Sequence, residues 1–230
     1  MRSDTMPLAA PNFDKMFQDG ARYPWRATRT AVVFVHQGGD LTMPSGQVTA
    51  CDPFIGLEFI EHAEPFTVAV PPGRYPVEVS LVGWTKEGEP DGPAEPERVA
   101  AAKLVISRET PVRWQMALVG DQDEADLADN EFYGYGVDAG TGCFADYASV
   151  PALHELVEEH DDRPGDNRLT DALEAAEWRE PVNLTTADGA SDLVAFMSGP
   201  GDGAYPTWIG FDVADRPACF ITDFEILRHA

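Results

Sequence analysis

Short runs of β-branched and aromatic residues, separated by turn-forming residues, recur through the first half of the chain. Turn signals stand at Gly38-Gly39-Asp40, Pro71-Pro72-Gly73 and Thr110-Pro111. The strands that this pattern predicts cover residues 31–35, 46–50, 66–70, 75–82, 99–107 and 112–119. We expect residues 46–50 to return along 31–35, and 66–70 to pair with 75–82. So many strands before residue 120 favour a β-sandwich or a strongly bent sheet.

The middle of the chain changes to a helical pattern. Residues 151–160 begin with a proline, which suits the first turn of a helix, and the helix predicted next covers residues 169–178. Both place apolar side chains on one face. Strands predicted at 193–197, 205–211 and 218–221 close the chain. The fold class is therefore α+β, mostly antiparallel β, with two mid-chain amphipathic helices.

The length of 230 residues suits one large domain. Residues 1–28 lack sustained periodicity, and we expect an N-terminal arm in which Phe13, Met16 and Phe17 dock on the body. Residues 29–230 then form a single compact domain. A division of that domain into a β lobe (29–120) and an α+β lobe (131–230) stays open.

Charge excludes some partners. The chain has 16 Lys and Arg against 40 Asp and Glu, a net charge of −24, which repels nucleic-acid phosphates and anionic membranes. A basic protein or a small molecule remains as a partner, although solubility alone explains the same charge. No signal-peptide pattern or membrane-length apolar run is present, and three scattered cysteines fit a reducing cytoplasm. The sequence says nothing about the oligomeric state.

Two glycine-rich segments are the main candidates for a ligand site. They cover residues 134–146 and 198–208, and glycines at this density let backbone amides approach a ligand. No Lys-Ser or Lys-Thr follows, so the phosphate-loop pattern is missing. The expected ligand-binding residues are Asp138, Gly140, Thr141, Asp146, Asp202, Tyr205 and Trp208. Turn formation is the alternative explanation for each of them.

Catalytic and metal-binding roles have weaker candidates. Cys143 is a possible nucleophile and His36, after a predicted strand, a possible base, although nothing in the sequence pairs them. Four acids at turns or strand ends, Asp138, Asp146, Asp202 and Asp223, could converge on a divalent cation. No cofactor is predicted beyond such a cation.

Several phrases together resemble one bacterial family. They are Ser45-Gly46, Cys51-Asp52-Pro53, Pro72-Gly73-Arg74-Tyr75-Pro76-Val77, Arg98-Val99-Ala100-Ala101-Ala102, Trp114, residues 136–144, residues 198–206 and Thr222-Asp223-Phe224. These phrases resemble the family called domain of unknown function 4241, from about residue 30 to the C-terminus. One departure is Pro200, where the family usually has an aromatic residue. The resemblance implies a bacterial cytoplasmic module and carries no activity.

The sequence therefore favours a cytoplasmic binding or regulatory module that uses the two glycine-rich segments. One version is an immunity-like role, in which an acidic β scaffold neutralises a basic toxin or nuclease. The alternative is a hydrolase with either an Asp-rich cation site or a Cys143 nucleophile. A composite site requires that the two glycine-rich segments meet in space.

Overall fold

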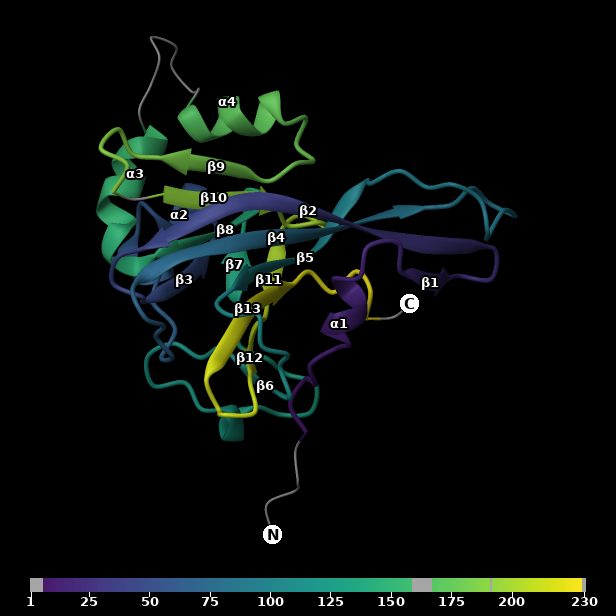
Figure 1. Ribbon diagram of the computed structural model, residues 1–230, viewed down its shortest axis with the longest axis horizontal. Coiled ribbons are helices and arrows are strands. Elements are labelled where there is room, and N and C mark those ends of the chain that lie inside the picture. Colours follow the sequence, from purple (N-terminus) through teal and green to yellow (C-terminus); the bar gives the residue numbers. More distant parts are fainter. Residues whose placement is uncertain (1–5, 159–166, 191, 229–230) are drawn as a thin grey trace.

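The computed structural model describes residues 6–158, 167–190 and 192–228. Its strands are mostly antiparallel, as the sequence predicted, and they form three sheets (Figure 1). The largest is strongly curled and has the strand order β1-β2-β4-β5-β13-β12-β6. Its strands are β1 (Arg22–Trp25), β2 (Arg29–Met43), β4 (Gly73–Trp84), β5 (Arg98–Val105), β6 (Arg113–Met116), β12 (Thr207–Phe211) and β13 (Pro217–Asp223).

A four-stranded sheet packs against one face of the large sheet. Its order is β3-β8-β10-β9, formed by β3 (Val48–Cys51), β8 (Thr141–Asp146), β9 (Val182–Thr185) and β10 (Asp192–Met197). The third sheet is a two-stranded ribbon of β7 (Tyr135–Val137) and β11 (Gly203–Tyr205). The short helices are α1 (Phe13–Met16), α2 (Pro53–Gly56), η1 (Ile60–His62), η2 (Glu124–Asp126) and η3 (Tyr147–Ser149).

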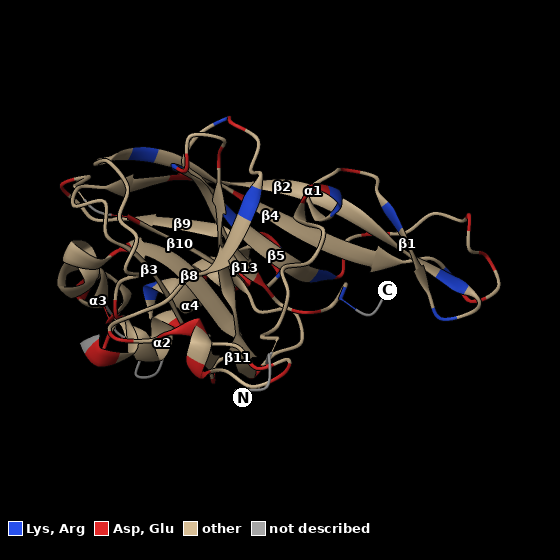
Figure 2. Ribbon diagram, turned by 90° about the horizontal axis from the view of Figure 1, so that it is seen from below, with Lys and Arg blue, Asp and Glu red and all other residues tan. Residues whose placement is uncertain are grey.

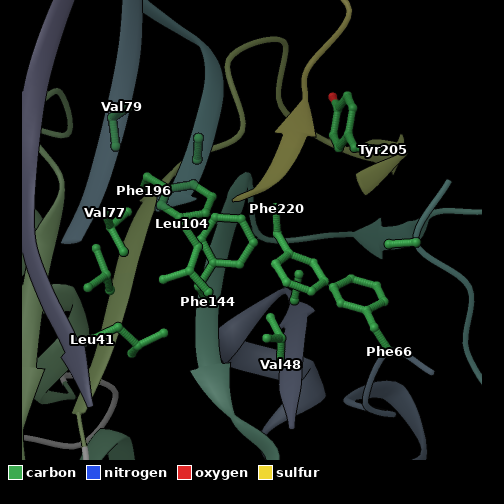
Figure 3. Packing of buried hydrophobic residues seen from close by; sticks show 14 of the residues in the cluster. Leu41, Val48, Phe66, Val77, Val79, Leu104, Phe144, Phe196, Tyr205 and Phe220 are labelled. Atoms are coloured by element: carbon green, nitrogen blue, oxygen red, sulfur yellow. The ribbon is translucent and has the colours of Figure 1, made fainter. Parts of the chain in front are cut away.

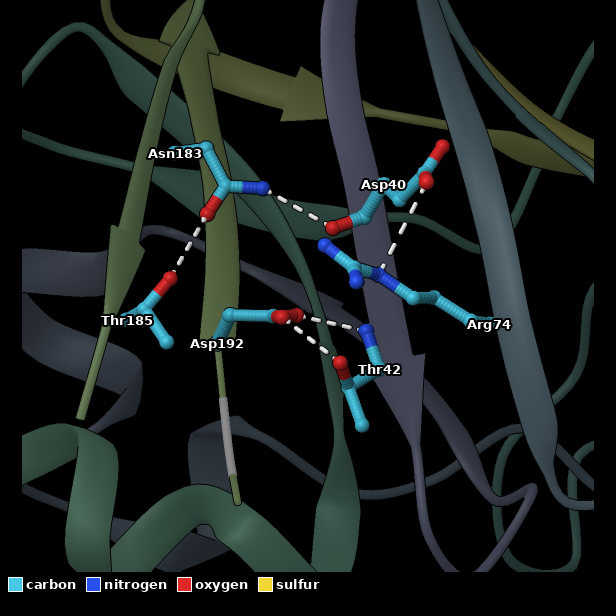
Figure 4. A network of polar contacts seen from close by, with 6 residues as sticks. All are labelled: Asp40, Thr42, Arg74, Asn183, Thr185 and Asp192. Carbon is cyan, nitrogen blue, oxygen red and sulfur yellow. Dashed lines mark hydrogen bonds and ion pairs between the residues drawn. The ribbon is translucent and has the colours of Figure 1, made fainter. Parts of the chain in front are cut away.

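The main core fills the space between the two larger sheets. Phe220 of β13 stacks on Phe66 with a centroid separation of 5.8 Å, and Phe144 of β8 packs at 5.5 Å from Phe196 of β10 (Figure 3). At the sheet margin the Asp192 carboxylate accepts hydrogen bonds from the Thr42 amide and hydroxyl, at 2.5 and 2.7 Å (Figure 4). This polar contact joins β10 to β2.

Two further clusters cover the outer faces of the sheets. Phe13 and Met16 of α1 are buried on the far side of the large sheet, where Phe13 lies 4.5 Å from Trp114 between ring centroids. Helices α3 (Val150–Glu158) and α4 (Arg168–Ala175) cover the far side of the small sheet with apolar residues that include Leu153 and Leu173. Successive strand residues face opposite sides, so Cys143 contacts the helix layer while Phe144 enters the main core.

The turn predicted at Gly38-Gly39-Asp40 is wrong. Strand β2 runs through these residues and pairs with β4 along its length, with a bulge between Gln37 and Gly39. The bulge inserts one residue, which reverses the faces that follow. Phe34 before it and Leu41 after it consequently both reach the main core, although their spacing is odd. Gly39 has φ +90°, which glycine tolerates best.

Two other pairing predictions also need correction. The predicted strand 66–70 does not form. The amides of Phe66 and Val70 donate separate hydrogen bonds to the backbone of 46–48, and within this segment only Phe66 forms a bridge, with Val119. Residues 46–50 do not return along 31–35, since β3 belongs to the small sheet. Strands β5 and β6 are separated in the large sheet by β13 and β12.

The two mid-chain helices are confirmed, and their ends differ from the prediction. The predicted end of the first helix at His160 lies outside the described residues. The second helix ends at Ala175 rather than 178, because Glu177 and Trp178 adopt positive φ values of 53° and 54°. The large sheet takes strands from both 29–120 and 131–230. The division of the chain at residue 28 and into lobes stays a prediction.

Candidate functional site

The two glycine-rich segments meet in space. Gly203, Ala204 and Tyr205 of β11 pair with Val137, Gly136 and Tyr135 of β7 in antiparallel register. Gly134 precedes this ribbon and lies flat against the backbone of Tyr205, where a Cβ atom would stand 2.4 Å from the Tyr205 carbonyl oxygen. Only glycine fits such a close approach, so this residue type is required by the crossing of the two segments.

The β7–β11 ribbon forms one wall of a pocket of about 560 Å³. A second part of the lining comes from α2 and η1, which contribute Ile55, Glu61 and His62. Further lining residues come from the ends of β3 and β12 and from residues 64–66 and 117–122. Phe66 bridges to Val119, so the last two segments are held to each other by backbone pairing.

Asp52 ties two walls of the pocket together. Its side chain is buried, and one carboxylate oxygen accepts from the Phe54 amide as the N-cap of α2. The other oxygen accepts from the amides of Asp138 and Ala139, at 2.9 and 2.8 Å. The carboxylate therefore fixes the position of α2 relative to the segment that follows β7.

Charge in the pocket is of one sign. The lining contains the carboxylates of Asp52, Glu61, Glu64 and Asp138 and no Lys or Arg among the described residues. Glu61, Glu64 and Asp138 are exposed, whereas Phe66 and Val137 supply buried apolar surface. The lining thus combines acidic side chains with buried apolar surface.

Burial raises the pKa of Tyr135, in the same wall, well above its ordinary value. His62 stands at the exposed end of η1, with Phe59 edge-on at 6.1 Å between ring centroids. In the described part of the chain, no group of three or more His, Cys, Asp or Glu side chains is placed to hold a metal ion. The pocket thus has an acidic lining, but its described residues form no group that could hold a metal ion.

A family model described as "Protein of unknown function (DUF4241)" matches residues 41–222. The chain belongs to the DUF4241 family. No curated protein and no solved structure matches this DUF4241 chain. Within its described residues, no helix is long and apolar enough to cross a membrane.

The structure of this DUF4241 member brings few of the sequence-predicted ligand residues into the pocket. Asp138 lines it, whereas Gly140 and Thr141 continue along the chain into β8. Tyr205 contributes its backbone to the ribbon, but its ring lies in the main core against Phe224, and its hydroxyl donates to the Gly201 carbonyl. Trp208 is buried in the cluster on the far side of the large sheet.

The four candidate metal ligands lie in different settings. Asp138 and Asp202 are exposed. Asp146 is fully buried, and its carboxylate accepts hydrogen bonds from Ser45, Gly46 and Ala148. Asp223 is buried beside Arg228, with 2.7 Å between Oδ2 and Nε, and burial raises its pKa to about 6. Two of these acids thus serve as internal hydrogen-bond or ion-pair acceptors.

The catalytic candidates Cys143 and His36 belong to different parts of the DUF4241 fold. The hydrogen bond with Cys51 and then burial raise the pKa of the Cys143 thiol well above its usual value, which disfavours the nucleophilic thiolate. Its sulfur lies 3.7 Å from that of Cys51. His36 contacts Glu180 instead, with 2.6 Å between Nδ1 and the carboxylate.

Sequence reasoning missed most of the pocket. Glu61, His62, Glu64 and Gln122 match no motif, because they come together only through the packing of α2, η1 and the segment after β6. Asp52 had a usable signal: an Asp directly before a Pro is a common start of a helix, with Asp as N-cap and Pro at the first position.

Proposed function

We propose that this protein is a binding module whose acidic pocket accepts a cationic group, the guanidinium or ammonium of a small molecule or of a basic protein. The observation that carries the proposal is the pocket lining, which has four carboxylates, buried apolar side chains and, among the described residues, no Lys or Arg. Electrostatic attraction favours the cation, and the apolar surface favours the methylene stem of an arginine or lysine.

An immunity-like role in the cytoplasm is the protein-partner version of this proposal. A basic toxin or nuclease would insert an Arg or Lys side chain, and the net charge of −24 would speed the encounter. The hydrolase alternative has less support. The described residues contain no metal-holding cluster, and the Cys143 thiol is buried with a raised pKa.

Binding of a charged probe and its neutral analogue tests the proposal. N-acetylargininamide and N-acetylcitrullinamide differ by one positive charge and little in shape, and titration calorimetry at low ionic strength compares them. We expect the arginine probe to bind and the citrulline probe to bind at least tenfold more weakly, a difference of about 1.4 kcal/mol. Added salt should weaken the arginine complex, since screening reduces the attraction.

A pair of charge-matched variants locates the binding. Glu61→Gln with Glu64→Gln removes two pocket charges, and we expect about a fivefold to tenfold loss of arginine affinity. The control, Glu89→Gln with Asp91→Asn, removes two charges from the exposed loop after β4 and should leave the affinity nearly unchanged. Equal affinities for the two probes, or equal losses in the two variants, would contradict the proposal.

A further inference from the structure

Two thiols face each other behind the pocket. Cys51 ends β3 and stands directly opposite Cys143 of β8 in the antiparallel register. Their sulfur atoms are 3.7 Å apart, both side chains are buried and both are reduced. The third cysteine, Cys219, lies in β13 of the large sheet. Only the first two are paired by the fold.

The strand register gives this pair the geometry of a disulfide. Opposite residues of antiparallel strands have Cα atoms about 4.5 or 5.5 Å apart. Both spacings fall inside the range of roughly 4.4 to 6.8 Å that disulfides span. Side-chain rotation is therefore enough to close the sulfur separation from 3.7 Å to bonding distance, without moving either strand.

The same pair adjoins the pocket wall. Asp52, which follows Cys51, holds α2 and the Asp138 amide together. Gly56 of α2 packs on Cys51, since a Cβ atom at Gly56 would stand 2.7 Å from the Cys51 sulfur. Helix α2 has only four residues, so we expect a local opening of this element to expose Cys51 at a lower free-energy cost than unfolding of the sheets.

We propose that Cys51 and Cys143 form a reversible cross-strand disulfide by exchange with a low-molecular-weight disulfide, R–S–S–R. The Cys51 thiolate attacks one sulfur of the reagent, so the reagent S–S bond breaks, a mixed disulfide forms and one RS⁻ leaves. The Cys143 thiolate then attacks the Cys51 sulfur and expels the second RS⁻. The two thiol protons end on the two RS⁻ groups, so the protein is oxidised by two electrons and the reagent becomes two R–SH.

Burial sets the rate of this exchange. The raised pKa of Cys143 keeps its thiol protonated at neutral pH, and Cys51 is buried, so we expect a reagent to reach it only after a local opening. The reaction is consequently slow at neutral pH and faster as the pH rises, because the thiolate is the attacking species.

Thiol counting on the full chain tests this inference without any pocket ligand. The native protein is incubated with oxidised glutathione, quenched with acid, unfolded and alkylated, and then peptide-mapped by mass spectrometry. We expect alkylation at Cys219 alone instead of at all three cysteines. We also expect a peptide pair joined through Cys51 and Cys143, with a mass about 2 Da below the sum of its two free-thiol peptides because two hydrogens are removed. Cys219→Ser should behave in the same way.

Two variants that each lack one of the paired cysteines complete the test. Cys51→Ser and Cys143→Ser should form no intramolecular disulfide under the same conditions. Three alkylated cysteines in the wild-type chain, mixed disulfides alone, or a disulfide that includes Cys219 would each overturn the inference. The wild-type map decides the question even if a variant fails to fold. Its outcome is independent of the proposed function, since no cationic probe is present.

Discussion

At the scale of single residues, buried carboxylates hold segments that are distant in sequence. Asp52 and Asp146 look alike in the sequence, because each stands beside a turn and near a cysteine. Asp146 also looks like Asp138, yet one is fully buried and the other is exposed. The difference comes from Ser45, which donates to Asp146 from 101 residues away. The local sequence around such an acid marks it as a candidate site residue. It does not show whether the carboxylate is hydrogen-bonded within the protein or exposed to solvent.

Asp146→Asn should destabilise the fold. The amide nitrogen of asparagine would face backbone donors of Ser45, Gly46 or Ala148, which leaves buried donors unpaired. We expect a loss of about 1–3 kcal/mol in the free energy of unfolding, measured by urea titration. Asp202→Asn, at an exposed position, is the control and should change stability by less than about 0.5 kcal/mol. Similar losses in both variants would refute the structural role of Asp146.

At the scale of elements, most strands could be predicted from the sequence, although the predicted strand 66–70 is absent, and the pairing of the strands could not be predicted. Runs such as 31–35 and 218–221 predicted strands correctly because their β-branched and aromatic composition is local information. The pair Gly38-Gly39 indicated a turn. In the structure it forms a bulge instead, because β2 continues to pair with β4 on both sides of it. The pairing of Cys51 with Cys143 could not be predicted either. The two residues are 92 positions apart in the sequence, and only the register of β3 with β8 places them opposite each other.

The bulge in β2 gives an element-scale prediction. Gly39→Ala introduces a side chain at φ +90°, and its Cβ would stand 3.1 Å from Nδ2 of Asn183. The strain should cost about 1–3 kcal/mol of unfolding free energy. Gly136→Ala is the matched control, because a Cβ there has no neighbour within 4 Å and the φ is not positive. Thermal and urea unfolding compare the two variants, and equal stability would mean that the bulge does not depend on Gly39.

At the scale of the whole molecule, the protein is a stack of sheet and helix layers with a strongly acidic surface. Helices α3 and α4 cover the small sheet, which packs on the large sheet, and α1 lies on the far side of the large sheet (Figure 1). The main core lies between the two sheets. Acidic residues are spread over many loops and strand ends and outnumber basic ones (Figure 2). The charge follows directly from the sequence, which also singled out the two glycine-rich segments but left open whether they meet. The sequence could not predict the pocket, whose other walls come from 50–66 and 117–122.

Chemical-shift mapping with N-acetylargininamide tests the central claim most directly. In a ¹⁵N-labelled chain, the amide signals of Gly134, Gly136 and Gly203 report on the pocket wall, whereas Gly20 and Gly189 lie in exposed turns away from its lining. The account predicts that the three wall glycines shift together with one saturating dissociation constant while the two turn glycines stay in place. Unchanged wall signals at saturating probe, or shifts that are larger at the turn glycines, would contradict it.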